Sequence, residues 1–141
     1  MGAVIGTTPN GRKAGAALSE GISPTQGADT HGPTVTLTSI VVTKHTKYIQ
    51  RAAQLLNMKL TPQAVEGEEG TKKLASLIRA WCDQKHWHIQ FNIVNREILI
   101  AAQKDPEKYR NLLVRVGGFS AFFADLSPQL QDEIIARTGH K

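Results

Sequence analysis

The 141-residue chain has one cysteine, few aromatic residues and no long apolar run. With Cys82 alone, an internal disulfide and a zinc site of four thiolates are excluded. No apolar segment approaches the length that spans a bilayer, and Met1–Val4 lacks the basic start of a signal peptide. These absences favour a cytoplasmic protein the size of one ordinary domain, with no membrane partner.

Basic residues exceed acidic ones, with a net charge of +5 and an isoelectric point near 9.6. They are scattered, for the most part singly and beside acidic residues, and no basic run is interleaved with aromatic side chains. This distribution favours a solvated surface over a nucleic-acid interface, so nucleic acid is not an expected partner.

The composition changes near residue 43. Residues 1–33 hold seven of the twelve glycines and three of the six prolines, which is typical of a loop or arm that lies against another surface. The β-branched, alternating run Val35–Thr43 predicts a strand. We therefore divide the chain into residues 1–43, a Gly/Pro-rich arm and strand, and residues 44–141, a second and more regular unit.

Strand and helix patterns alternate in the second unit, which predicts an α/β fold with crossover connections. Leu74, Leu77, Ile78 and Trp81 share one face of an expected helix, and Ser127–Pro128 is typical of a helix start. The expected strands are Gln54–Leu60, His88–Val94 and Asn111–Val116, and the expected helices are Gly67–Trp81, Arg96–Gln103 and Gln129–Arg137.

A glycine-rich segment, Gly6–Lys13, has the two glycines of a phosphate-binding loop. However, Arg12 stands where that loop needs its lysine, and Lys13 stands where it needs a hydroxyl for magnesium. A tight turn at Pro9–Gly11 explains the segment better.

Three potential metal ligands, Cys82, His86 and His88, occur close together. Their spacing matches no standard zinc pattern, and no fourth ligand is near. The neighbouring residues Trp81, Trp87 and Phe91 favour a packed corner with an inert thiol.

The pair Gly117–Gly118 separates two apolar segments and has two interpretations. The first is a two-residue hairpin turn, because glycine accepts the positive φ angles that such turns require. The second is chemical: a radical formed by removing one hydrogen from a glycine Cα is delocalised into both flanking amides. Such a radical would need ordered, apolar surroundings to exclude water and oxygen.

The segment Arg115–Ala121 resembles the Arg-Val-x-Gly-Tyr signature of glycyl radical enzymes, with Gly118 at the radical position. Further blocks of the chain resemble the same C-terminal region in the same order, and together they cover nearly the whole sequence. These blocks are Pro9–Gly15, Ile22–Gly27, Gly32–Thr34, Leu55–Lys59, His88–Asn92 and Pro106–Arg110. They look closest to the branch with glycerol and propanediol dehydratases, choline trimethylamine-lyase and aryl-acetate decarboxylases, and less like pyruvate formate-lyase.

The resemblance implies that the chain is the C-terminal portion of a ten-stranded β/α barrel, with the Gly-rich arm continuous with that barrel. It implies that Gly118 stores a radical, supported by Arg115, Val116, Gly117, Phe119 and Ser120, with Phe122 also shielding the loop. An activating enzyme with an iron–sulfur cluster and S-adenosylmethionine would install the radical, and no metal or cofactor would stay bound. The chemistry would be anaerobic and oxygen-sensitive.

Two departures from the family pattern matter. Phe119 replaces the signature tyrosine, and the catalytic cysteine is missing, because Cys82 lacks the expected Gly-Cys-x-Glu context. We therefore expect a lyase domain that is inactive alone and needs a larger subunit carrying the thiol. The opening Met1–Gly6 resembles internal sequence, which favours a split or truncated reading frame. The alternatives are an inert fragment or a non-catalytic basic α/β interaction module.

Overall fold

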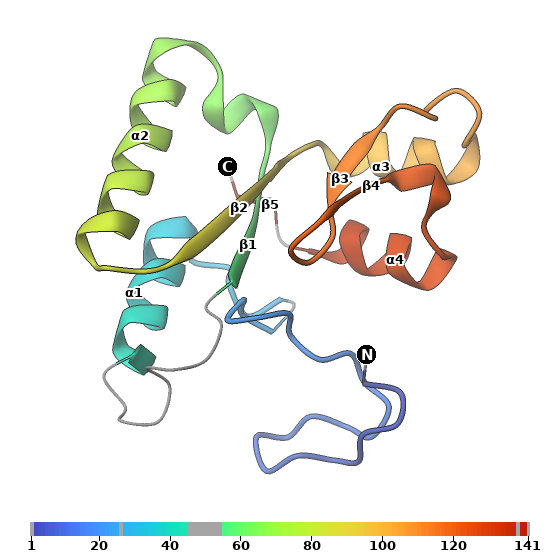
Figure 1. The fold of residues 1–141 in the computed structure, drawn as a ribbon, viewed down its shortest axis with the longest axis horizontal. Coiled ribbons are helices and arrows are strands. Elements are labelled where there is room, and N and C mark those ends of the chain that lie inside the picture. The colour runs from blue at the N-terminus through green and yellow to red at the C-terminus, as the bar shows by residue number, and fades with distance from the viewer. Residues whose placement is uncertain (1, 26, 45–54, 138, 141) are drawn as a thin grey trace.

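The computed structural model describes residues 2–25, 27–44, 55–137 and 139–140. Two helices and a small parallel sheet form one half of the molecule, and a β-hairpin with two further helices forms the other (Figure 1). The arm occupies residues 2–25 and lies below both halves in that view. Among the described residues, no helix combines the length and apolar character that crossing a membrane requires.

The parallel sheet contains three strands in the order β2-β1-β5, namely His88–Ile93, Leu55–Leu60 and Gly139–His140. Helix α2, Gly67–Asp83, connects β1 to β2, and α3, Arg96–Lys104, follows β2. The expected α/β crossover and the strands at Leu55–Leu60 and His88–Ile93 are confirmed; Gln54 lies outside the described residues. The two-residue strand β5 was not predicted.

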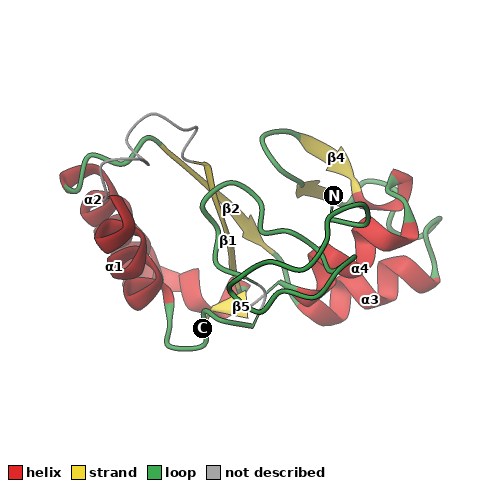
Figure 2. Ribbon diagram, turned by 90° about the horizontal axis from the view of Figure 1, so that it is seen from below, coloured by secondary structure: helices red, strands yellow, loops and turns green. Residues whose placement is uncertain are grey.

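Residues 111–116 were expected to form a third strand of this parallel sheet, but they do not join it. Strand β3, Leu113–Arg115, pairs antiparallel with β4, Ser120–Phe122, in a separate two-stranded sheet. A short 3₁₀ helix, η2 (Phe123–Asp125), and helix α4, Pro128–Ala136, complete this half (Figure 2). The apolar pattern identified a strand, but its partner follows directly across the glycine pair.

The strand predicted at Val35–Thr43 is wrong, because residues Pro33–Lys44 form helix α1. Leu37 and Ile40 are buried in the cluster that contains Trp81 of α2, while Val35 and Val42 are exposed. One face of a helix buries these two side chains, and this packing overrides the β propensity of the branched residues. The expected boundary between residues 43 and 44 stays a prediction, and residues 45–54 lie outside the described chain.

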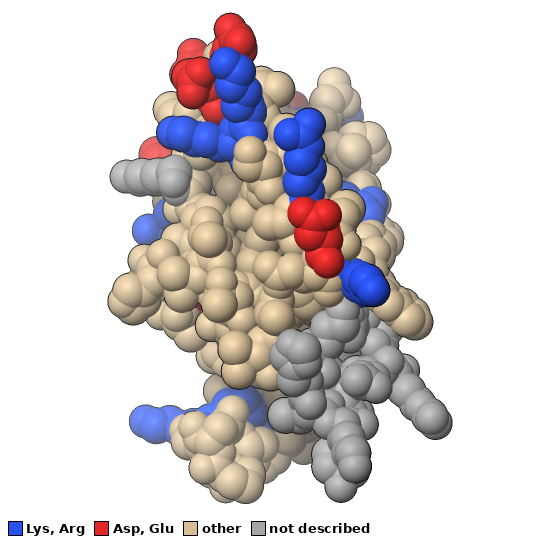
Figure 3. All heavy atoms as spheres, turned by 90° about the vertical axis from the view of Figure 1, so that its left-hand side faces the viewer, with Lys and Arg blue, Asp and Glu red and all other residues tan. Residues whose placement is uncertain are grey.

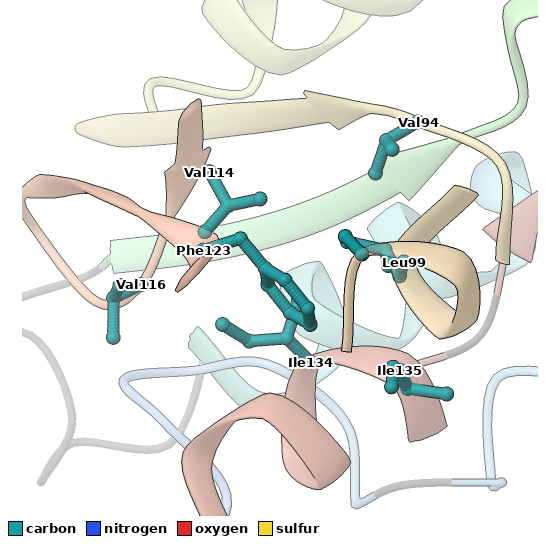
Figure 4. Close-up of a cluster of buried hydrophobic side chains, with 8 residues drawn as sticks. Val94, Leu99, Val114, Val116, Phe123, Ile134 and Ile135 are labelled. Carbon is teal, nitrogen blue, oxygen red and sulfur yellow. The ribbon is translucent and has the colours of Figure 1, made fainter. Parts of the chain in front are cut away.

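The core consists of two separate clusters. One lies between α1, α2 and the apolar face of the parallel sheet, and includes Leu56, Met58 and Trp81. The other lies between α3, α4 and the hairpin, and Figure 4 shows Phe123, Ile134, Leu99 and Val114 at its centre. Val116, which directly precedes Gly117, is buried in this second cluster.

The charged surface agrees with the expected solvated pattern. On the face in Figure 3, basic and acidic side chains lie next to one another. Lys72, for example, forms exposed ion pairs with Glu68 and Glu69 at 2.8 and 3.2 Å. Such exposed pairs contribute little to stability because solvent screens the two charges.

Candidate functional site

The glycine pair forms the tip of a hairpin, as predicted. Arg115 pairs with Ser120, and the Val116 N–H donates to the Phe119 carbonyl at 2.9 Å, which leaves Gly117 and Gly118 as the turn. Gly118 has a φ of +93°, in the region that side chains with a Cβ rarely adopt. The backbone conformation of the turn therefore requires a glycine at position 118 but not at position 117.

The two glycines face different neighbours. Among the described residues, a Cβ at Gly118 would meet only Leu55 Cδ2, at 3.8 Å, which is ordinary contact. A Cβ at Gly117 would lie 3.1 Å from Glu20 Oε2, the end of a side chain from the arm. The arm therefore reaches the turn, and β1 lies beneath it.

The parallel sheet turns a polar face towards this hairpin. In the parallel register Asn57 is opposite Gln90, and Lys59 is opposite Asn92, so these four side chains share one face. Lys59, Gln90 and Asn92 are nevertheless buried. Buried polar groups need partners: Asn92 and Lys59 find them in the backbone of the glycine hairpin and of α4, and Gln90 Oε1 accepts a hydrogen bond from the Arg115 side chain.

Asn92 binds the strand that leads into the turn. Its Nδ2 donates to the Arg115 carbonyl at 2.8 Å, and its Oδ1 accepts the Arg115 N–H at 2.8 Å. One amide side chain thus satisfies both backbone groups of Arg115, as a neighbouring strand would. Gln90 adds a bond to Arg115 Nε at 2.5 Å, and the same guanidinium donates to Ser120 Oγ at 3.0 Å.

Arg137 approaches the same strand end from the C-terminus of α4. Its Nη1 donates to the Arg115 carbonyl at 3.2 Å, and its Nη2 donates to the Val116 carbonyl at 2.9 Å. The side chain is only 10% exposed and forms an ion pair of 2.8 Å with Glu20 of the arm. Glu133, one turn earlier on α4, lies 3.5 Å from the same nitrogen.

Two ionisable groups near Arg137, Glu20 and Lys59, have perturbed pKa values. Burial raises the pKa of Glu20 to about 7, although the nearby Arg137 charge opposes the increase. Burial likewise lowers the pKa of Lys59 to about 8, and its Nζ donates to the Ile135 carbonyl at 3.3 Å. Perturbed, partly desolvated groups cluster at functional sites, and these line one pocket of about 230 Å³ beneath the arm.

The residues expected to support the radical loop occupy distinct environments. Val116 is buried and Arg115 is partly buried, whereas Gly117, Gly118 and Ser120 are exposed. Phe119 and Phe122 are 55% and 45% exposed, and Leu113, opposite Phe122 in the hairpin, is 58% exposed. The outer face of the hairpin is therefore apolar and accessible in this chain.

The Cys82, His86 and His88 candidate does not assemble. Cys82 lies exposed near the end of α2, and His88 is also exposed, whereas His86 stacks on Trp81 with ring centroids 4.2 Å apart. Trp87 is 74% exposed, so the expected packed corner contains Trp81 and His86 but neither Trp87 nor the thiol. Within the described ranges, no three His, Cys, Asp or Glu residues are grouped to hold a metal ion.

The segment Gly6–Lys13 forms the expected turn. Gly11 N–H donates to the Thr8 carbonyl at 3.0 Å, and Thr8 N–H donates to the Arg12 carbonyl at 3.1 Å. The Arg12 guanidinium donates to the carbonyls of Ile5, Gly6 and Ala16 and so closes the arm on itself. Arg12 therefore stabilises the fold of the arm through these hydrogen bonds.

Four side chains at this site were not singled out from the sequence: Glu20, Gln90, Asn92 and Arg137. A usable signal was present in β1 and β2. Parallel strands buried on both faces are usually continuous apolar runs, whereas here polar residues alternate with apolar ones. That alternation indicates a sheet face that binds polar backbone.

Comparison with known proteins agrees with this site. A family model described as "Glycine radical" matches residues 18–124, which include the hairpin. The chain therefore belongs to the glycyl radical family, and it is a glycine radical domain.

The most informative relatives are large enzymes. The chain is 59% identical over 140 residues to the isethionate sulfite-lyase of Nitratidesulfovibrio vulgaris, and 44% identical over 138 residues to the trans-4-hydroxy-L-proline dehydratase of Clostridioides difficile. Among solved structures, the glycerol-bound B12-independent glycerol dehydratase of Clostridium butyricum is 47% identical with a TM-score of 0.89. These matches cover 98–99% of this chain but only 17% of each relative.

Proposed function

We propose that Gly118 is the radical-bearing residue of this domain. The observation that carries the proposal is its position at the tip of a hairpin whose base is fixed by Asn92 and Arg137. Gly118 has two Cα hydrogens and no side chain, and its left-handed backbone disfavours any other residue. Removal of one hydrogen atom leaves a carbon radical that both neighbouring amides stabilise.

The remaining steps of this proposal need other protein chains. An activating enzyme that uses an iron–sulfur cluster and S-adenosylmethionine removes the hydrogen atom. A cysteine thiol then returns a hydrogen atom to Gly118 and becomes the thiyl radical that attacks the substrate. Such a cysteine would lie in a larger barrel portion, whether on a partner subunit or in the same polypeptide. The fraction of the relatives that this chain spans supports that view.

Exposure of the hairpin also supports a larger partner. Phe119, Phe122 and Leu113 together present apolar surface beside Gly118. Apolar surface around a radical site must be covered to exclude water and oxygen, and these residues leave it open within this chain. We propose that the barrel portion covers this face, and that it determines the substrate. Isethionate is the first substrate to test, given the 59% identical sulfite-lyase.

The decisive experiment is an anaerobic electron paramagnetic resonance spectrum after incubation with an activating enzyme, S-adenosylmethionine and a reductant. Wild type should give a doublet from a carbon radical coupled to one α-hydrogen, and Gly118→Ala should give no such signal. Gly6→Ala is the matched control, because among the described residues a methyl group there would meet nothing within 4 Å and its φ lies outside the left-handed region. A folded wild-type chain without a doublet, treated with an activator proven on an intact homologue, would refute the proposal. It would favour the inert fragment or the binding module.

A further inference from the structure

We propose that Arg137 is a positioning residue for the glycine hairpin, and that Glu20 of the arm holds Arg137 in place. This inference rests on the proposed role of Gly118, but its structural part can be tested without a radical. Arg137 and Glu20 lie at opposite ends of the sequence and meet only beneath the turn.

The hydrogen bonds at the mouth of the turn carry the argument. Opposed residues that flank a two-residue hairpin turn normally exchange two backbone hydrogen bonds. Here Val116 N–H donates to the Phe119 carbonyl. Among the described residues, however, the donor to the Val116 carbonyl is Arg137 Nη2, at 2.9 Å, and not the Phe119 N–H. The Arg137 guanidinium thus takes the place of the Phe119 N–H as the donor to the Val116 carbonyl, in the last residue pair before Gly117.

Arginine is suited to this role because its planar group presents several donors in fixed directions. Arg137 contacts two consecutive carbonyls, those of Arg115 and Val116, while pairing with Glu20 at 2.8 Å. The Arg137 side chain is 10% exposed and that of Glu20 is 22% exposed, so solvent screens this contact only partly. The Glu20 carboxylate also lies against Gly117, which couples the arm directly to the turn.

The consequence concerns the peptide planes next to the radical carbon. Delocalisation of a Cα radical requires its flanking amides to be nearly coplanar with it, so the path of the chain into the turn affects the spin density on Gly118. Arg137 fixes the carbonyl of Val116 and therefore the plane of the Val116–Gly117 peptide, which directly precedes the Gly117–Gly118 amide that flanks the radical carbon. In this way Arg137 at the end of α4, together with Glu20 of the arm, influences the backbone geometry at Gly118.

The test uses the whole 141-residue chain with Arg137→Met, Arg137→Lys and Glu20→Gln. Arg110→Met is the matched control, because within the described part of the chain Arg110 forms an ion pair with Glu107 alone, and both side chains are more than 70% exposed. Loss of the charge-assisted bond to the Val116 carbonyl should loosen the last pair before the turn, so exchange of the Val116 amide hydrogen, which is bonded to the Phe119 carbonyl, should accelerate about tenfold or more in Arg137→Met. Arg137→Lys should recover part of the protection, Glu20→Gln should lose a smaller part, and the control should match wild type.

A second readout is the radical spectrum. Arg137→Met and Arg137→Lys should alter the splitting of the doublet, which reports spin density on the Gly118 Cα, in addition to lowering the radical yield. Should Arg137→Met fail to fold by circular dichroism, Arg137→Lys and Glu20→Gln decide the question. Unchanged Val116 exchange and an unchanged splitting in the folded variants would overturn the inference. If wild type itself forms no radical, the proposed function fails, and the exchange data still decide the role of Arg137.

Discussion

Asn92 offers the most direct test of how the glycine hairpin is attached to the sheet. Its side chain is 6% exposed and makes two hydrogen bonds of 2.8 Å with the backbone of Arg115. Replacement by alanine leaves the Arg115 N–H without its acceptor in a partly buried position. The Arg115 carbonyl keeps Arg137 Nη1 as a donor at 3.2 Å, so only one of the two groups becomes unpaired.

These contacts set the expected magnitude. An unpaired buried donor costs about 1–3 kcal/mol, and the second lost bond adds about 0.5–1.5 kcal/mol. We therefore expect Asn92→Ala to lower the free energy of unfolding by about 2–3 kcal/mol, measured by urea denaturation with an unchanged m-value. Asn111→Ala, at an exposed asparagine before β3, should change it by less than about 0.5 kcal/mol. If Asn92→Ala costs no more than Asn111→Ala, the hairpin is not held by this amide and the reasoning is wrong.

Two further predictions concern stability. Phe123 is fully buried at the centre of the α3–α4 cluster, so Phe123→Ala should lower the free energy of unfolding by about 3–5 kcal/mol; a loss below about 1 kcal/mol in urea denaturation would show that this cluster is loosely packed. For Lys59, burial lowers the pKa from 10.5 to about 8, so the native lysine releases its proton before the unfolded one does. Wild type should therefore gain stability relative to Lys59→Met as the pH rises from 8 to 10.5, by up to about 3 kcal/mol. Denaturant titrations across this range test the sign, and a pH-independent difference between the two proteins would contradict it.

The sequence predicted the elements whose signals are local. Helix α2 follows from the spacing of Leu74, Leu77 and Trp81, and the turn follows from Gly117–Gly118. Helix α1 was mistaken for a strand because its β-branched residues suit either structure, and the choice depends on packing against α2. Strand β5 contains only two residues, which is too short for any alternating pattern.

Of the candidate site, only the glycine at the tip of the hairpin could be predicted from the sequence. Gly118 is recognisable from a continuous motif, whereas Asn92 lies 23 residues before Arg115, and Arg137 lies 21 residues after Val116. Such contacts depend on tertiary structure, and no spacing rule connects them. The sequence therefore located the expected radical position but not the side chains that hold it.

The division of the core into two clusters has a consequence for how disturbances spread. The apolar face of the parallel sheet packs on α1 and α2, while its polar face contacts the hairpin through directed hydrogen bonds. Close-packed side chains transmit displacement in many directions, whereas a hydrogen bond resists motion along one axis and yields to rotation about it. The glycine hairpin is thus joined to the polar face of the sheet by hydrogen bonds, while the α1–α2 half packs on the opposite face.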